Sequence, residues 1–230
     1  MQIIDPNNAV RQRETHPTPR CPLCREIGTE LFFADDIRTY LRCSHCRLVF
    51  VPKRFWLDAD EERAVYALHR NAPDDPGYRQ FLSRLSIPLS QRLETGSHGL
   101  DFGCGPGPAL AAMLAEHGHR TDLFDPFFVD DRAVFTRRYD FICATEVVEH
   151  LRDPDREFTT LFSLLKPKGW LGIMTKRVID RNAFSRWHYI RDPTHICFYS
   201  RATFAYLARR FHAEYEVVDK DVIVMRKIEG

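Results

Sequence analysis

Four of the seven cysteines stand in two tight pairs, a spacing that is typical of a metal site. Cys21 and Cys24 form the first pair, Cys43 and Cys46 form the second, and 18 residues separate them. Two C-x2-C knuckles at this separation supply four thiolates to one tetrahedral zinc ion, which we predict to be structural because no coordination position stays open. Two disulfides are the alternative, but the odd cysteine total and the lack of a secretory signal disfavour them. His45, inside the second pair, is interpreted as a surface residue.

A glycine-rich turn marks a second candidate site. The residues LDFGCGPG at 100–107 place glycines at 103, 105 and 107, directly after a short apolar stretch. Such a turn lets a ligand approach the backbone closely, at the strand end where open α/β sheets bind ligands. Asp125 ends the next expected strand, where a carboxylate can accept both hydroxyls of an adenosine ribose. A dinucleotide site is the alternative, but its G-x-G-x-x-G spacing requires a shift of register.

The segment 176–198 holds candidates for acid–base chemistry. His188 and His195 flank Asp192, and a turn at Asp192-Pro193 can bring that carboxylate to an imidazole. Histidine suits a general base near neutral pH, although a packed loop position is the favoured interpretation for each histidine taken alone. The basic and aromatic residues of the segment favour RNA, a phosphate-bearing small molecule or a solvated loop. Cys104 and Cys143 are poorer candidates for a nucleophile, because apolar surroundings raise the pKa of a thiol.

Strands and helices alternate regularly from about residue 98, which predicts a parallel sheet covered on both faces. The expected strands are 98–103, 121–125, 139–145, 170–175 and 197–200, with a turn at 166–169 and helices at 108–118, 157–166 and 201–211. Ser200 is the expected N-cap of the last helix. The short connection between the final strands, 213–219 and 222–227, predicts an antiparallel hairpin.

The expected domain organisation places a boundary near residue 95. Residues 1–20 are expected to form a loose arm, 21–54 the zinc ribbon, 55–95 a helical linker region and 96–230 the main α/β domain. The linker contains two helical patterns, at 58–70 and 78–93, and Pro88 is expected to kink or split the second.

Composition limits the classes of function. The 230 residues include 33 Lys and Arg against 32 Asp and Glu, so a net charge of +1 gives no overall attraction for a polyanion. Hydrophobic residues make up 44% and aromatic residues 12%, which are globular proportions. No run approaches the ~18 apolar residues of a membrane span, and the polar opening lacks the core of a signal peptide. We therefore expect a cytoplasmic protein with no membrane partner, and the oligomeric state is left open.

Four motifs together resemble the class I S-adenosylmethionine-dependent methyltransferases: LDFGCGPG, LFDP, YDFICATEVVEHL and LLKPKGWLGIMT. The resemblance covers about 98–228 and implies a three-layer, Rossmann-like α/β sheet that ends in an antiparallel hairpin, here behind a small N-terminal zinc ribbon. A ribbon followed by such a domain also resembles bacterial methyltransferases with an N-terminal zinc-binding module, some of which act on sugars.

The resemblance also implies roles for individual residues. The cofactor-binding positions for S-adenosyl-L-methionine are Asp101, Gly103, Gly105, Gly107, Asp125 and Thr145. Asp101 lies near the charged amine in this interpretation, the glycines surround the methionine part, and Asp125 holds the ribose. Thr145 and Glu146 border cofactor and acceptor, and His150 matches the histidine of an E-x-x-x-H segment. With the segment 176–198, the catalytic candidates become His195, His188, Glu146 and His150.

One departure from the family concerns the adenine site. Only 14 residues separate Asp125 from Asp140, too few for the usual helix and third strand. Asp130 or Asp131 can reach the adenine from a loop, although a loose charged loop is the favoured interpretation, and adenine can instead pack on Phe127 or Phe128.

The prediction for function is methyl transfer from S-adenosylmethionine to oxygen of a small acceptor such as a sugar or nucleotide sugar. The alternative is a zinc-ribbon RNA-binding protein whose second domain methylates RNA or binds cofactor without turnover. The sequence does not identify the acceptor.

Overall fold

The larger of two sheets has six strands in the computed structural model, which describes residues 19–67 and 72–228. Its strand order is β5-β4-β6-β7-β10-β9. The strands are β4 His98–Phe102, β5 Arg120–Phe124, β6 Tyr139–Thr145, β7 Leu165–Met174, β9 Ala213–Val217 and β10 Val222–Lys227. The first four strands in the order are parallel, and β10 runs antiparallel to both β7 and β9. The predicted parallel sheet with its closing hairpin is confirmed, but the expected strand at 197–200 does not belong to it.

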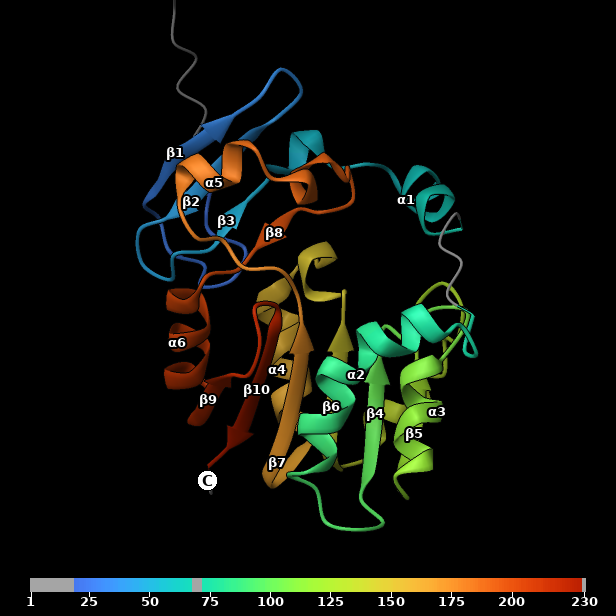
Figure 1. The fold of residues 1–230 in the computed structure, drawn as a ribbon. Coiled ribbons are helices and arrows are strands. Elements are labelled where there is room, and N and C mark those ends of the chain that lie inside the picture. Colours follow the sequence, from blue (N-terminus) through green and yellow to red (C-terminus); the bar gives the residue numbers. More distant parts are fainter. Residues whose placement is uncertain (1–18, 68–71, 229–230) are drawn as a thin grey trace, which may run out of the picture.

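Helices cover both faces of this sheet, as the alternation of strands and helices predicts (Figure 1). They are α2 Pro76–Ser90, α3 Ala109–Glu116, α4 Pro154–Leu164 and α6 Arg201–Arg210. Successive side chains of β6 point to opposite sides: Phe141 and Cys143 pack with α2 and α3, whereas Ile142 and Ala144 join the cluster that contains α4 and α6. Both faces are therefore apolar and buried.

Capping side chains explain where α2 and α6 begin. The side chain of Asp75 accepts the backbone N–H of Tyr78, and Ser200 forms the expected cap with Thr203. Pro88 does not split α2, contrary to the expectation. The helix ends two residues later, at Ser90, so the missing N–H falls in its last turn.

The sequence predicts a turn at 166–169 between a helix and a strand, and this prediction is wrong. β7 already begins at Leu165, directly after α4, and its pairing with β6 is irregular between Tyr139 and Phe141. Lys168 takes a left-handed φ of 63° at this irregularity. The strand therefore passes through the Lys-Pro-Lys-Gly residues.

A second sheet combines residues from distant parts of the chain. Its order is β1-β2-β3-β8, with β1 Thr29–Ala34, β2 Thr39–Cys43, β3 Val49–Phe50 and β8 Cys197–Phe198. β8 comes from the segment after β7 and pairs antiparallel with β3. Figure 1 shows this segment, with the short α5 Arg181–Ser185, lying against the N-terminal strands above the carboxyl ends of β4, β6 and β7. The expected division near residue 95 stays a prediction.

Aromatic side chains pack the segment that contains α5 and β8 against the N-terminal sheet. The ring of Phe184 makes edge contacts with Phe32, Tyr40 and Phe198 at centroid distances of 5.2, 5.1 and 5.3 Å. All four side chains are buried. The two sheets consequently share one continuous hydrophobic cluster.

The stretch between β5 and β6 contains no further strand of the large sheet. It has an isolated bridge between Asp125 and Val129 and a 3-10 helix at Arg132–Thr136. β5 therefore remains the edge strand, in agreement with the short spacing in the sequence. No helix within 19–67 or 72–228 is long and apolar enough to cross a membrane.

Candidate active site and metal centre

A cavity of about 1120 Å³ lies at the carboxyl ends of β4 and β6. Parallel strands present their chain ends at one edge of a sheet, which explains why residues far apart in sequence meet here. The predicted cofactor-binding and catalytic residues that line it are Gly103, Gly105, Asp125, Thr145, Glu146, His150, His188 and His195. Asp101 and Gly107 are not in its wall. The Gly107 carbonyl instead accepts the N–H of Ala109 at the start of α3.

The glycines at 103 and 105 have different roles in the turn. Both take a left-handed φ, of 80° and 64°. A Cβ on Gly103 would lie 2.3 Å from Cγ2 of Val147, whereas a Cβ on Gly105 would meet nothing within 4 Å. Gly103 is therefore required by packing, and Gly105 leaves open space on the cavity side.

Backbone donors hold the carboxylate of Asp125. Its Oδ2 accepts the N–H of Gly105 at 3.0 Å, and its Oδ1 accepts those of Phe127 and Phe128 at 2.9 and 3.3 Å. These bonds connect the end of β5 to the glycine turn. Since a carboxylate has about four acceptor positions, capacity remains for ligand hydroxyls.

Asp101 lies buried behind the glycine turn. Burial, together with the charge of Asp125, raises the pKa of the Asp101 carboxyl to about 7. Tyr78 of α2 lines the cavity, and burial with the nearby charges of Asp101 and Glu146 raises its pKa to about 12. A cationic ligand group close to Asp101 would reverse the carboxyl shift.

Two polar atoms near the end of β6 lack partners among the described residues. These buried atoms are Oγ1 of Thr145 and Oε1 of Glu146. Glu146 follows the strand with a left-handed φ of 52°. Burial, followed by the charge of Glu149, raises the pKa of Glu146 to about 9. Its carboxyl therefore carries a proton at neutral pH and can donate to a ligand, and unsatisfied buried groups of this kind indicate a binding site.

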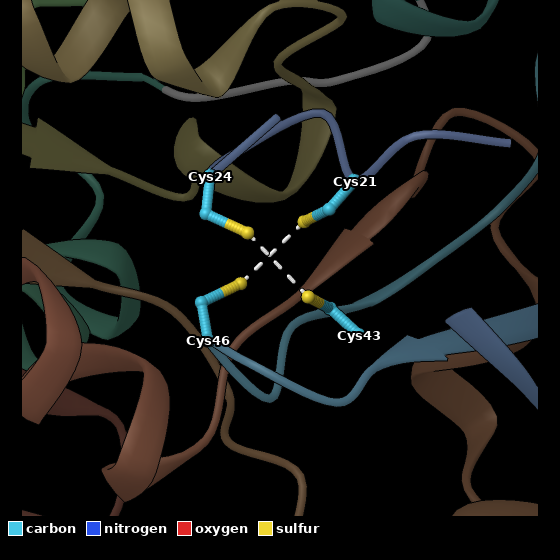
Figure 2. Close-up of side chains that lie close together, drawn as sticks. All are labelled: Cys21, Cys24, Cys43 and Cys46. Carbon is cyan, nitrogen blue, oxygen red and sulfur yellow. Dashed lines mark hydrogen bonds between the residues drawn. The ribbon is translucent and has the colours of Figure 1, made fainter. Parts of the chain in front are cut away.

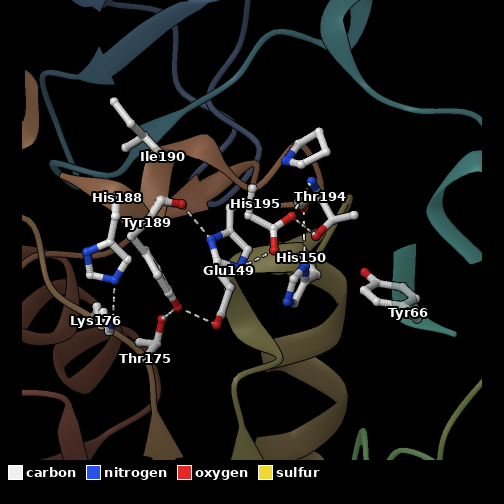
Figure 3. Close-up of polar contacts among 12 residues, drawn as sticks. Tyr66, Glu149, His150, Thr175, Lys176, His188, Tyr189, Ile190, Thr194 and His195 are labelled. Atoms are coloured by element: carbon white, nitrogen blue, oxygen red, sulfur yellow. Dashed lines mark hydrogen bonds and ion pairs between the residues drawn. The ribbon is translucent and has the colours of Figure 1, made fainter. Parts of the chain in front are cut away.

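Glu149, Tyr189 and His195 form a buried hydrogen-bonded group at the other end of the cavity (Figure 3). The Tyr189 hydroxyl donates to Oε1 of Glu149 and lies 3.3 Å from Oγ1 of Thr175. Nδ1 of His195 lies 2.7 Å from the carbonyl oxygen of Tyr189. Burial lowers the pKa of His195, although the charge of Glu149 opposes this effect.

Only one of the two histidines that flank Asp192 approaches its carboxylate. Nε2 of His195 lies 3.6 Å from Oδ2 of Asp192, whose Oδ1 accepts the N–H of Thr194 at 2.8 Å. His188 is exposed, and its Nε2 lies 2.8 Å from Nζ of Lys176. The expectation that Asp192 orients either histidine therefore applies to His195 alone.

Sequence reasoning missed several residues of the cavity and its surroundings. They are Tyr66, Tyr78, Glu149 and Tyr189. Tyr66 comes from α1 Ala59–Tyr66 in the expected linker, and its ring lies 5.3 Å from that of His150. The only available signal was the acidic neighbour of His150 in the E-x-x-x-H segment.

The four clustered cysteines fit a tetrahedral metal site. The Sγ atoms of Cys21 and Cys46 lie 3.4 Å apart, and the Sγ atoms of Cys24 and Cys43 are also 3.4 Å apart (Figure 2). Disulfide sulfurs lie ~2.05 Å apart, whereas four sulfurs at ~2.3 Å from one zinc ion lie ~3.8 Å apart. All four cysteines are free thiols, and His45 is exposed. The donor set would hold zinc without an open position.

Arg38 of the ribbon fixes the turn that carries His195. Its buried guanidinium donates to the carbonyl oxygens of Asp192, Pro193 and His195 at 2.7, 3.1 and 3.2 Å, and also to that of Ile190. Arg38 lies in the connection between β1 and β2. The ribbon therefore positions one wall of the cavity.

Comparisons with known proteins agree with this architecture. A family model described as a methyltransferase domain matches residues 70–218. The 1,6-didemethyltoxoflavin-N1-methyltransferase of Burkholderia thailandensis, solved with bound 1,6-didemethyltoxoflavin and S-adenosylhomocysteine, is 17% identical to this chain. The match covers 88% of this chain and 100% of that one, with a TM-score of 0.52. A chain from the complex of the Haloferax volcanii Trm112 methyltransferase activator with a putative methyltransferase is 13% identical, with coverages of 76% and 100% and a TM-score of 0.50. No curated protein matches this chain significantly by sequence.

Proposed function

The chain belongs to the methyltransferase domain family, and we propose that it transfers a methyl group from S-adenosylmethionine to an oxygen atom of a small acceptor, such as a sugar or nucleotide sugar. One observation carries the proposal: a single cavity extends from the glycine turn to His150 and His195. Transfer to a hydroxyl needs a donor site and a group that removes a proton, held in alignment. The two ends of this cavity meet both requirements.

The cofactor end has features that suit S-adenosylmethionine, which supplies an electrophilic methyl group on a sulfonium. Open space at Gly105 admits the ligand beside the backbone. Asp101, buried behind the glycine turn, would lie near the amine without lining the cavity, and Asp125 would face the ribose hydroxyls. The unpartnered oxygens of Thr145 and Glu146 would gain partners from a bound ligand. Adenine would pack on Phe127 or Phe128, which both line the cavity.

At the acceptor end, His195 is the favoured proton acceptor. Its Nδ1 donates to a carbonyl, so the lone pair of the neutral ring is on Nε2. The lowered pKa keeps the ring neutral at pH 7, and Asp192 and Glu149 would stabilise the imidazolium that forms. His188 is a weaker candidate because it is exposed and contacts Lys176. Glu146 already holds a proton at neutral pH and suits a donor role.

Burial of the aromatic residues favours a small acceptor over RNA. Phe184 and Tyr189, in the basic segment after β7, are packed inside the molecule. Base stacking requires exposed aromatic faces. Three arginines of the segment are exposed, namely Arg181, Arg186 and Arg191. Among the aromatic residues beside them, only the half-buried Trp187 offers part of a face for stacking. RNA methylation therefore remains the second candidate.

The test is a screen with S-adenosylmethionine labelled in the methyl group. Purified protein is incubated separately with a panel of sugars and nucleotide sugars and with total RNA. We expect label in a small hydroxyl compound. Label in RNA alone would promote the second candidate, and no binding of S-adenosylhomocysteine by calorimetry would contradict the proposal altogether.

Once an acceptor is known, His195→Ala should lower kcat by about 10²- to 10⁴-fold, the usual contribution of a positioned base. His188→Ala is the matched control, for which a smaller effect is expected. Affinity for S-adenosylhomocysteine should barely change in either variant. A kcat near the wild-type value in His195→Ala would direct attention to His150.

A further inference from the structure

Three potential metal ligands converge at the acceptor end of the cavity. They are a carboxylate oxygen of Glu149 and imidazole nitrogens of His150 and His195, and one atom from each lies within 4.8 Å of the others. This group is separate from the four cysteines. Two histidines and one carboxylate are a common ligand set for divalent transition metals that keep open positions for a substrate.

The hydrogen bonds around the group resemble the outer shell of a metal site. Nδ1 of His195 lies 2.7 Å from the carbonyl oxygen of Tyr189, and Nδ1 of His150 lies 3.2 Å from that of Thr194. Histidines that bind metals usually donate one ring N–H to such an acceptor, which directs the lone pair of the other nitrogen to the metal. Figure 3 shows both rings beside Glu149.

Glu149 adds an independent observation. Glu149 is fully buried, and the Tyr189 hydroxyl donates a hydrogen bond to its Oε1. Its Oε2 is also buried and has no hydrogen-bond partner among the described residues. A buried carboxylate oxygen without a partner is costly, and a cation would satisfy it.

We propose that Glu149, His150 and His195 bind a divalent transition-metal ion. Mixed imidazole and carboxylate donors favour Zn²⁺, Fe²⁺, Co²⁺ or Mn²⁺ over Mg²⁺ or Ca²⁺. Ligand atoms ~2.1 Å from one ion lie ~3.0–3.5 Å apart, so the group would contract by on the order of 1 Å on binding. His150 and His195 line the cavity, which gives the ion access to an acceptor.

The consequence for catalysis rests on the proposed methyl transfer, whereas the binding of the ion does not. An acceptor hydroxyl bound to the ion would have a lower pKa and would release its proton to water. The oxygen would then attack the methyl carbon as the bond to the sulfonium sulfur breaks, and S-adenosylhomocysteine would leave. His195 is then a ligand through Nε2 and does not act as the base. Turnover would depend on the metal in this case and would not in the simple histidine mechanism.

Titration with Co²⁺ tests the site without an acceptor. Cobalt in the four-cysteine site gives strong thiolate charge-transfer absorption, whereas cobalt bound by nitrogen and oxygen gives only weak visible bands. We expect protein that holds a single equivalent of Zn²⁺, bound by the four thiolates, to take up one equivalent of Co²⁺ with weak bands alone. Glu149→Gln and His195→Ala should abolish this uptake, and His188→Ala, a histidine of the same segment, should retain it.

Tyr189→Phe supplies a finer test, because it removes the bond to Oε1 of Glu149 but keeps the ring. Loss of an outer-shell bond should weaken Co²⁺ binding by about 10- to 100-fold. Failure of the wild-type protein to bind this equivalent, or uptake that survives in Glu149→Gln with His195→Ala, would overturn the metal site. S-adenosylhomocysteine binding, measured on the same samples, shows that each variant is folded and tests the methyltransferase proposal separately.

Discussion

We predict that Asp101 makes cofactor binding sensitive to pH. Its carboxyl pKa is about 7, far above the usual 3.8, because burial and Asp125 disfavour the charged form. The folded protein without ligand therefore loses this proton only near neutral pH. A ligand ammonium favours the ionised form, so cofactor binding should strengthen as pH rises through this range.

We predict that affinity for S-adenosylhomocysteine increases about tenfold between pH 6 and pH 8, the change in the ionised fraction of a group with this pKa. Calorimetric titration across that range is the measurement. Asp101→Asn, which cannot ionise, should bind weakly with a flat profile. An equally steep profile in Asp101→Asn would assign the pH dependence to another group.

The two glycines of the turn should respond differently to alanine. Gly103→Ala places a Cβ against Val147 and adds strain from the left-handed φ, so it should lower the free energy of unfolding by at least about 2 kcal/mol. Gly105→Ala has only the strain, about 1–2 kcal/mol, but its methyl group would enter open space at the proposed cofactor site. Denaturant unfolding and calorimetry should show a folded Gly105→Ala with much weaker cofactor binding. Unchanged binding would place the cofactor elsewhere.

At the level of elements, the connection between β1 and β2 supports the turn at 190–195 through Arg38. Carbonyl groups of this turn accept hydrogen bonds from the buried guanidinium. A planar group with several N–H donors is needed for such a contact, and lysine cannot replace it fully. The distance of the residue in sequence from the turn conceals this role.

Arg38→Met should lower the free energy of unfolding by at least about 2 kcal/mol, because several buried carbonyl groups lose their donor. Turnover should fall, while affinity for S-adenosylhomocysteine stays near the wild-type value. Arg42→Met is the control, since Arg42 on β2 makes a more exposed ion pair with Glu30. If both variants had equal stability and turnover, the turn would not depend on Arg38.

For the whole molecule, the ribbon supports the segment that we propose as part of the acceptor site. β3 pairs with β8, and Arg25 and Arg210 both pair with Asp155 at the start of α4. The proposed cofactor end lies at the ends of β4, β5 and β6, and none of these strands belongs to the ribbon sheet. Loss of the ribbon metal should therefore affect the two ends of the cavity unequally.

Cys24→Ser combined with Cys46→Ser removes two of the four thiolates. We predict that this variant binds S-adenosylhomocysteine almost normally, has little turnover, and is cleaved within 188–198 by a protease that leaves the wild type intact. Mass spectrometry of the fragments identifies the cleavage positions. A wild-type cleavage pattern would contradict the support of 188–198 by the ribbon. Loss of cofactor binding together with turnover would contradict the independence of the two ends.

The sequence by itself determined the features that depend on short spacings. The cysteine pairs predicted the sulfur cluster, the glycine turn marked the cavity, and hydrophobic periodicity predicted the order of strands and helices, because each signal lies within a few residues. The short stretch after Asp125 correctly excluded another strand of the sheet.

Only the tertiary structure decided which distant residues meet. Arg38 reaches carbonyl groups more than 150 positions away, Tyr66 of the linker contacts His150, and β8 joins the ribbon sheet. The raised pKa of Asp101 likewise depends on burial and on a charge across the fold. The same is true of the different surroundings of His188 and His195. Local patterns specify which face of an element is apolar, but they do not specify the segment that covers it, since that choice depends on packing over the whole chain.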